Sequence, residues 1–240
     1  MKKVIEILQW IIVLSIIVGL MAFSNRNQKK ILCKDIDIHI KENENDFIDS
    51  NTINELFSKK NQYPLGRSIN EIELSELEKS INNHPLVKNV NVYSDISGKI
   101  YVEVQQKIPT ARIVSNYDSF YIDKDGNKML LSENHTARVL VISGNVDLIS
   151  ELKIFSLAKY IDEHSFWRSQ IMQIYVDESG ELLLIPRVGD QKIVFGKTDN
   201  MIKKFDKLSL FYRKGIVGNG WKKYSTINLK FKNQIVCTKK

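Results

Sequence analysis

The sequence predicts an α+β protein in which an N-terminal transmembrane helix precedes a small module of strands and helices and then a larger β-rich domain. Apolar residues alternate with polar ones in two runs, 90–92 and 100–104, on either side of a Gly-containing turn, as in a β-hairpin. Apolar stripes at spacings of three and four occur before and after this hairpin and indicate helices. Of the 240 residues, 43% are hydrophobic and 26% are charged, which is typical of a folded chain with one or two domains.

The first apolar segment spans residues 7–23 and is interrupted only by Gln9 and Ser15. A helix of this length rises roughly 25 Å, near the lower limit for crossing the apolar core of a bilayer. A cleaved signal peptide is the alternative, but residues 19–23 offer no good small-x-small cleavage site. We therefore expect a tail at 1–6, a transmembrane helix at 7–25 and a juxtamembrane linker at 26–32.

One strand and two helices are expected between this segment and the hairpin. Residues 35–40 alternate strictly between polar and apolar side chains and should form the strand. Asp49 or Ser50 can cap the first helix, whose buried side is the stripe Ile53, Leu56 and Phe57. Asn70 and Glu73 have the spacing of a capping box for the second helix, whose stripe is Leu74, Leu77 and Ile81. Because a proline then stops this helix, the module has the order β-α-α-β-β.

The second domain starts near Ala111, after Pro109, which cannot donate to a β-ladder. Its strands are expected in a hairpin at 119–128 and at 139–142, 171–176, 181–185, 192–195, 224–231 and 234–237. Two helical stripes interrupt them: Ile154, Leu157, Ala158 and Ile161, then Met201, Phe205, Leu208 and Tyr212. We expect an antiparallel sheet against which these two helices pack.

The β-α-α-β-β order, closed by residues 107–111, resembles a POTRA domain as found in the FtsQ/DivIB family of bacterial cell-division proteins. The resemblance continues in the Asp-x-x-Gly hairpin at 119–128 and in the apolar-x-apolar-Gly element that ends at Gly196. The tail at 233–240 lacks the Gly-rich, Trp-ending sequence of better-known members and resembles the Bacteroidota branch instead. The resemblance implies a POTRA domain at 33–110 and an FtsQ-type β domain at 111–240.

The same resemblance implies a non-catalytic scaffold in the inner membrane, with its N-terminus in the cytoplasm and its C-terminal domains in the periplasm at the division septum. It implies that FtsB/FtsL-type proteins bind the C-terminal strands, and that other divisome proteins can bind the POTRA domain. Lysines and arginines lie on both sides of the apolar segment, so charge alone does not set the orientation.

The partner contact is carried over to the last strands of the chain. Residues 227–231 match the family's apolar-x-apolar-basic-aromatic pattern, and a strand at a sheet edge can pair with an extended partner segment. The resemblance thus implies a binding site that comprises Lys230, Phe231, Tyr224, Trp221, Ile227 and Leu229. The alternative for Phe231 is that it is an ordinary core residue of the strand.

A catalytic alternative rests on Ser156 and Lys159, which form a Ser-x-x-Lys, and on the sequence at 197–199, which is one residue from Lys-Thr-Gly. Penicillin-recognising acyl enzymes use such motifs, and their serine and lysine must share one pocket. Both residues turn away from the predicted packed side of their helix, and no Ser-x-Asn follows them. We therefore expect no catalytic residues.

Other function classes find little support. Cys33 and Cys237 are expected to be isolated thiols, and the four histidines lack metal-ligand spacing, so neither a metal nor a cofactor is predicted. The net charge of +7 is spread along the chain without a nucleic-acid-binding module. A POTRA-bearing component of protein transport or outer-membrane assembly is the main alternative, although such proteins usually carry a large C-terminal barrel, for which the second domain is too short.

Overall fold

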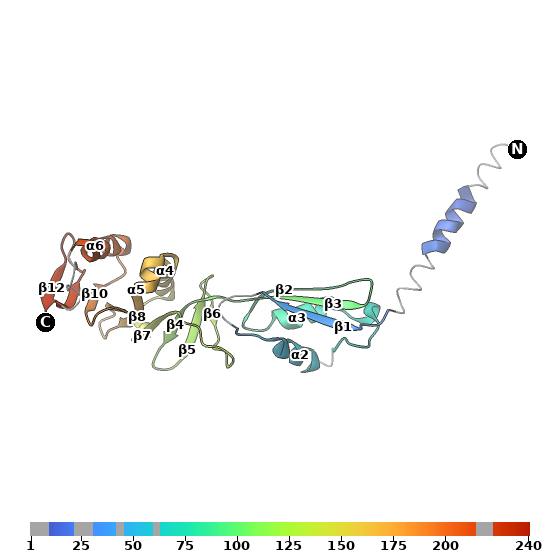
Figure 1. Ribbon diagram of the computed structural model, residues 1–240, viewed down its shortest axis with the longest axis horizontal. Coiled ribbons are helices and arrows are strands. Elements are labelled where there is room, and N and C mark those ends of the chain that lie inside the picture. The colour runs from blue at the N-terminus through green and yellow to red at the C-terminus, as the bar shows by residue number, and fades with distance from the viewer. Residues whose placement is uncertain (1–9, 22–30, 42–45, 60–62, 215–222) are drawn as a thin grey trace. The chain divides into compact units, whose positions relative to one another are not determined.

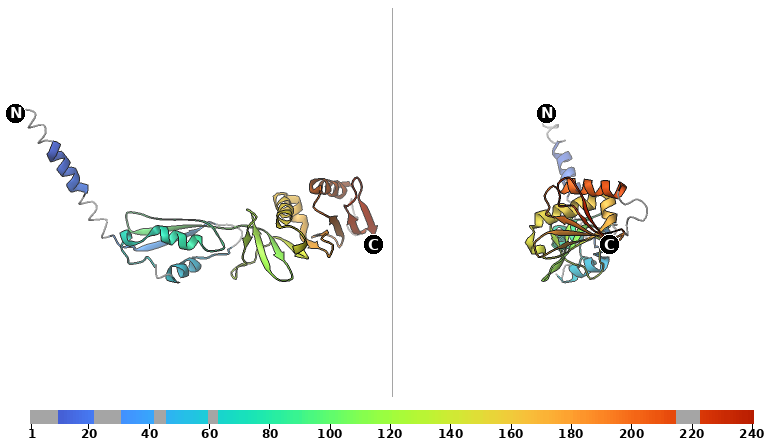
Figure 2. Two further views of the ribbon diagram at one scale, coloured as in Figure 1. Left: turned by 180° about the vertical axis from the view of Figure 1, so that it is seen from behind. Right: turned by 90° about the vertical axis from the view of Figure 1, so that its left-hand side faces the viewer.

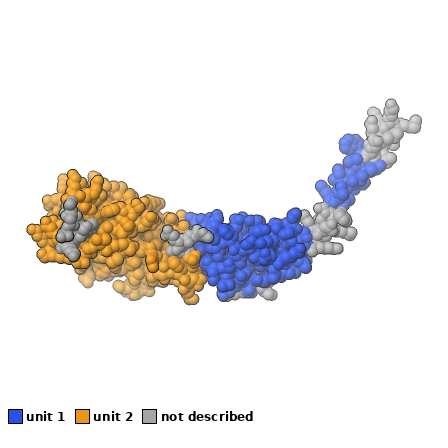
Figure 3. Space-filling model, in the orientation of Figure 1, with its two compact units in different colours: residues 1–42, 48–106 blue, residues 43–47, 107–240 orange. Residues whose placement is uncertain are grey.

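The computed structural model describes residues 10–21, 31–41, 46–59, 63–214 and 223–240. The chain divides into two compact units, which Figure 3 distinguishes by colour. The first contains residues 1–42 and 48–106, and the second contains residues 43–47 and 107–240.

The N-terminal segment is helical at residues 10–21, with its apolar side chains exposed. This helix forms part of the predicted transmembrane segment at 7–25, whose other residues lie outside the described part of the chain. The predicted tail at 1–6 lies outside it as well, as does most of the predicted linker. Within the described residues, no helix is both long and apolar enough to cross a membrane.

Among the described residues of 31–106, the first unit has three strands and two α-helices, which are labelled in Figure 1. Its central strand β3 (Lys99–Gln106) pairs in parallel with β1 (Asp35–Ile40) and antiparallel with β2 (Val87–Ser94). The helices are α2 (Ser50–Lys59) and α3 (Leu74–Asn82). Their apolar stripes supply core residues together with alternate residues of β3: Ile53, Phe57, Leu77, Ile81, Ile100, Val102 and Val104. The predicted strand, hairpin and element order are confirmed.

The two helices begin differently. Asp49 caps α2, because its carboxylate accepts hydrogen bonds from the hydroxyl and the backbone N–H of Thr52, at 2.6 and 2.8 Å, which lower the pKa of Asp49. The predicted capping box at Asn70 is wrong: α3 begins only at Leu74, and a 3-10 turn occupies Ile69–Glu71. The backbone N–H of Ile69 donates to the Ile31 carbonyl at 2.9 Å, and this bond holds the preceding segment in a non-helical path.

The second unit is built on one nine-stranded sheet in the order β12-β11-β10-β9-β8-β7-β4-β5-β6. The strands are β4 (Pro109–Val114), β5 (Ser119–Asp123), β6 (Lys128–Met129), β7 (Leu140–Gly144), β8 (Ile171–Val176), β9 (Leu182–Pro186), β10 (Lys192–Gly196), β11 (Tyr224–Asn228) and β12 (Val236–Lys239). Pro109 and Thr110 lie in β4 of this unit, although the sequence assigns them to the preceding domain.

The predicted antiparallel sheet is wrong, because β4–β7, β7–β8 and β10–β11 are parallel pairs. The chain forms α4 (Glu151–Glu163) and α5 (Ser165–Gln170) between β7 and β8, and α6 (Met201–Lys214) between β10 and β11. Helical connections of this kind return the chain in the same direction, which produces parallel pairs. Figures 1 and 2 show α4 and α6 on the same side of the sheet. The short helix α5 was not predicted.

The helix-covered face of the sheet carries a continuous apolar row. Residues paired in register share a face, and the register connects Ile113, Ile142, Ile174, Leu184, Ile193, Ile227 and Cys237 from β4 to β12. The two predicted helical stripes pack into this core, with all of their residues buried except Met201, which is partly buried. The helices therefore protect the middle of the sheet from water on this side.

Three hairpin turns share the pattern Asp-x-x-Gly. The carboxylates of Asp95, Asp123 and Asp177 each accept hydrogen bonds from the backbone N–H groups two and four residues later, at 2.8 to 3.0 Å. The glycines that end these turns have positive φ angles, which other residues rarely adopt. The angles are 91° at Gly98, 88° at Gly126 and 75° at Gly180. The turn chemistry predicted for the hairpin at 119–128 is confirmed and recurs at β2–β3 and β8–β9.

Candidate protein-binding edge

The C-terminal strand lies at one end of the nine-stranded sheet. β12 has four residues and pairs with β11, and within the described part of the chain no strand pairs with its other side. None of its residues is fully buried. Such an edge presents N–H and C=O groups to which an extended segment of another protein can hydrogen-bond.

The six predicted partner-binding residues differ in how accessible their side chains are to a partner. Ile227 and Leu229 are fully buried core residues, so a partner cannot reach their side chains. Tyr224 is half-buried at the start of β11, with its ring centroid 5.8 Å from that of Phe211. Lys230 and Phe231 are exposed. Trp221, the sixth residue, lies outside the described residues.

The turn after β11 is held by side chains that replace ladder hydrogen bonds. The predicted strand at 224–231 ends early, at Asn228, whose side-chain oxygen accepts the N–H of Lys230 at 3.0 Å. The ammonium group of Lys207 donates to the carbonyls of Leu229 and Phe231. Burial of this ammonium, and secondarily the positive charge of Lys204, lower the pKa of Lys207. These bonds hold residues 229–231 in the turn that leads from β11 to β12.

Phe231 is 45% exposed, so the alternative that it is an ordinary core residue is wrong. A large aromatic ring left in water near a strand edge is available to fill a pocket or cover apolar surface on a partner. In the turn that Lys207 holds, this ring is presented by an ordered backbone, which lowers the entropic cost of binding.

The side chain of Lys230 crosses β10. Gly196 has a φ angle of +73°, and a Cβ atom there would lie only 2.8 Å from the Cγ of Lys230. The Lys230 ammonium reaches Glu181, with 2.7 Å between nitrogen and carboxylate oxygen. The glycine that ends the apolar-x-apolar-Gly element therefore leaves room for the lysine of the C-terminal pattern. This explains physically why the two motifs occur in one chain.

The catalytic alternative does not gather its residues in a pocket. Ser156 and Lys159 are both exposed on α4. The Ser156 hydroxyl donates to the Leu152 carbonyl in its own helix at 2.7 Å, and Lys159 pairs with Glu163 at 3.8 Å. This geometry lacks the shared site that an acyl enzyme needs.

Metal-ligating side chains do not cluster in the described part of the chain. Cys33 and Cys237 are free thiols, as predicted. Burial raises the pKa of both thiols, so neither is an activated thiolate.

Comparison with known proteins gives two family matches. A family described as FtsQ/DivIB, C-terminal related, matches residues 108–238, which is more than half of the chain. The chain belongs to the FtsQ/DivIB family. A POTRA-like domain matches residues 31–105. No curated protein matches the chain.

FtsQ/DivIB proteins are generally non-catalytic division proteins. Membership therefore indicates a scaffold role in bacterial cell division, with partners among the proteins of the division machinery. Family membership therefore favours a role in cell division over the alternative role in protein transport or outer-membrane assembly.

Sequence reasoning about this FtsQ/DivIB chain missed part of the edge. The last strand is at 236–239 and not at 234–237, so Thr238 and Lys239 belong to β12. The ion pair of Lys230 with Glu181 was also missed, because the two residues are far apart in sequence. The glycine after the apolar run of β10 was the available signal, since a positive φ in a strand often marks close approach of another chain segment.

Proposed function

We propose that this protein is a membrane-anchored scaffold that recruits FtsB/FtsL-type proteins to the division septum through its C-terminal edge strand. The observations that support this proposal are the open side of β12 and the exposure of Lys230 and Phe231 in the turn that joins β11 to β12. An extended partner segment would continue the sheet by hydrogen-bonding to β12. Lys230 and Phe231 would select the partner by charge and by apolar contact.

The membrane is part of the proposed mechanism. Residues 7–25 would anchor the chain in the inner membrane with the N-terminus in the cytoplasm, and both units would lie in the periplasm. Confinement to the membrane raises the effective concentration of weak contacts. The POTRA-like unit would supply a second contact surface for other divisome proteins.

The edge is tested by co-purification of the full-length chain with co-expressed FtsB and FtsL. The variant Lys230→Glu with Phe231→Ala should abolish recovery of the complex, because it reverses the charge and removes the exposed ring. Charge reversal also places a second carboxylate beside Glu181, so Lys230→Gln with Phe231→Ala is a second variant that avoids this repulsion. It should reduce recovery strongly.

A matched control uses another adjacent pair of an exposed apolar residue and a lysine. Leu152→Ala with Lys153→Glu makes the same charge reversal and truncates an exposed apolar side chain at the start of α4, and it should leave recovery unchanged. Undiminished recovery with both Lys230 variants would refute the assigned surface. An equal loss in the control would also refute it.

Localisation tests the cellular role separately. A fluorescent fusion of the full-length chain should form a band at mid-cell in dividing cells, and depletion should give filamentous cells with segregated chromosomes. Recovery of the protein in the outer-membrane fraction would favour the transport alternative. Normal division after depletion would remove the proposed role.

A further inference from the structure

A pocket of about 1050 Å³ lies in the second unit, remote in strand order from the C-terminal edge. It sits where three adjacent parallel strands begin, since Pro109, Leu140 and Ile171 are the first residues of β4, β7 and β8 and all line it. Residues of α4 and α5 form another part of its wall. In the order of the sheet, β9, β10 and β11 separate β8 from β12.

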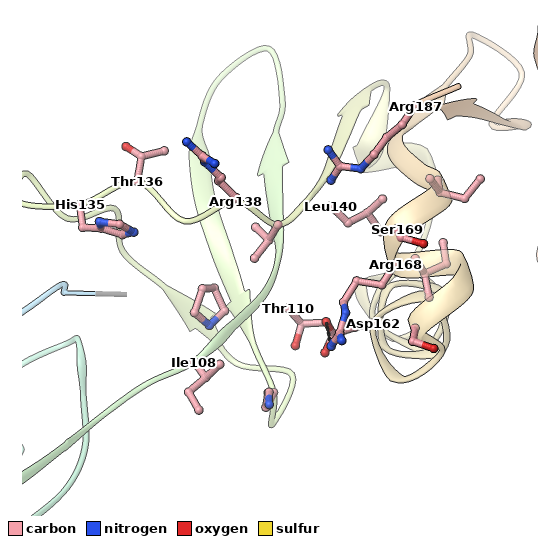
Figure 4. A pocket seen from close by; sticks show the side chains of 16 residues that line it. Ile108, Thr110, His135, Thr136, Arg138, Leu140, Asp162, Arg168, Ser169 and Arg187 are labelled. Carbon is pink, nitrogen blue, oxygen red and sulfur yellow. Dashed lines mark ion pairs between the residues drawn. The ribbon is translucent and has the colours of Figure 1, made fainter. Parts of the chain in front are cut away.

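Basic side chains from separate segments line this pocket. Arg138 precedes β7, Arg168 belongs to α5, Arg187 follows β9 and Lys124 follows β5. Figure 4 shows the three arginines on different parts of the surrounding chain. Among the described residues of the lining, Asp162 is the one acidic side chain, so together these residues carry an excess of positive charge.

The arginines differ in whether they already have a partner. Arg168 lies 3.9 Å from the carboxylate of Asp162, and Figure 4 shows the two side by side. Within the described residues, the guanidinium groups of Arg138 and Arg187 have no carboxylate partner. Both are exposed and can form paired hydrogen bonds with an incoming carboxylate or phosphate.

The base of the pocket is apolar. Leu140, Ile161 and Ile171 line it while belonging to the buried core of the sheet and α4, and the partly buried side chains of Ile108 and Val139 add apolar surface that a ligand can contact. Inorganic phosphates have no group that would contact such a surface, and a lipid bilayer is flat where this site is concave. A peptide that carries both acidic and apolar side chains matches both parts of the lining.

We propose that this pocket binds an acidic segment of a partner protein, with Arg138 and Arg187 holding its carboxylates and the apolar base contacting the side chains between them. The volume accommodates several peptide residues, and Arg138 and Arg187 lie at different places around the pocket (Figure 4), which suits a ligand with more than one negative charge. The pocket is a second binding site, distinct from the proposed pairing of FtsB/FtsL-type proteins at β12.

The test measures binding of a fluorescent hexapeptide, Glu-Leu-Asp-Glu-Leu-Asp, to the full-length chain in a neutral detergent by anisotropy. Arg138→Gln with Arg187→Gln should weaken binding about tenfold or more, because two charge-assisted contacts are lost. The control Arg213→Gln with Lys214→Gln removes the same charge at the exposed end of α6 and should change the dissociation constant less than about twofold, since distant surface charges are screened by salt. A peptide with Gln and Asn in place of Glu and Asp should not bind.

Equal weakening in the two double variants, or no weakening in either, would overturn the proposal. Tripolyphosphate and phosphatidylglycerol vesicles are further probes: binding of either that depends on Arg138 and Arg187, without binding of the acidic peptide, would assign the site to phosphate ligands instead. Unchanged unfolding midpoints in denaturant titrations followed by tryptophan fluorescence verify that the variants fold. Lys230→Gln with Phe231→Ala should leave peptide binding intact, so failure of the pocket and failure of the edge proposal are distinguishable.

Discussion

Strands β8 and β12 belong to one sheet but serve different purposes. β8 pairs with β7 and β9, and three of its six residues are fully buried. β12 pairs with β11 alone and buries none of its four residues fully. The middle of the sheet therefore supplies stability, whereas its C-terminal end retains hydrogen-bonding groups and side chains that a partner can use. Substitutions in the two strands should differ accordingly.

The largest effect is expected in the middle of the sheet. Ile174 lies in β8, is fully buried, and belongs to the apolar row under the helices. Ile174→Ala should lower the free energy of unfolding by about 3 kcal/mol, because it removes buried methyl and methylene groups and leaves a cavity. Urea denaturation of the full-length chain, followed by its tryptophan fluorescence, to which buried Trp167 contributes, measures this loss. A loss below about 1 kcal/mol would show that the surrounding residues collapse into the space and that the row is not tightly packed.

A pH-dependent effect of at most similar size on the free energy of unfolding is expected from Tyr212 in α6, the helix that covers the same face of the sheet as α4. Burial raises the pKa of Tyr212 to about 12, although the side chains of Gln191 and Gln170 oppose this shift. Because the folded state disfavours the phenolate, the contribution of Tyr212 to stability is complete below about pH 10, the pKa of an unperturbed tyrosine, and is lost as the pH rises through the folded-state value. Up to about 3 kcal/mol should disappear in this window.

The variant Tyr212→Phe isolates this contribution, since lysines titrate in both proteins. The difference in unfolding free energy between the original chain and the variant should shift in favour of the variant as the pH rises above about 10. Parallel pH profiles would mean that the Tyr212 hydroxyl has the same pKa in the folded and unfolded chain.

Local periodicity was sufficient to predict most elements of both units. The strands Asp35–Ile40 and Ile171–Val176 occur with the predicted bounds, and the stripes of α4 and α6 are buried as expected. These features depend on side chains a few residues apart, whose pattern states directly which face meets the core. The exposure of Ser156 and Lys159 followed from the same argument.

Features that depend on distant residues could not be predicted in this way. Phe47 lies between a predicted strand and a predicted helix, yet it is buried in the second unit with its ring centroid 5.9 Å from that of Tyr121. The contact of Lys230 with Glu181 and the basic pocket around Arg138 similarly join segments far apart in sequence. The order and direction of the strands in the sheet decide which of these residues come into contact. The periodicity of a single sequence determines neither the order nor the direction. The parallel pairs β7–β8 and β10–β11 were nevertheless foreseeable, because each of the two helical stripes lies between two predicted strands.

The smallest effect on stability is expected at the edge itself. Val236 is 43% exposed at the start of β12, and the ion pair of Lys230 with Glu181 is partly open to water. Val236→Ala should therefore change the free energy of unfolding by less than about 0.5 kcal/mol, and Lys230→Gln by less than about 1 kcal/mol, when measured by the same urea titration. If Lys230→Gln left stability nearly unchanged while, combined with Phe231→Ala, it reduced recovery of FtsB/FtsL, the edge would be separated from the core as a binding element. A loss as large as that of Ile174→Ala would instead make Lys230 a structural residue, whose effect on partner binding would follow from unfolding of the end of the sheet.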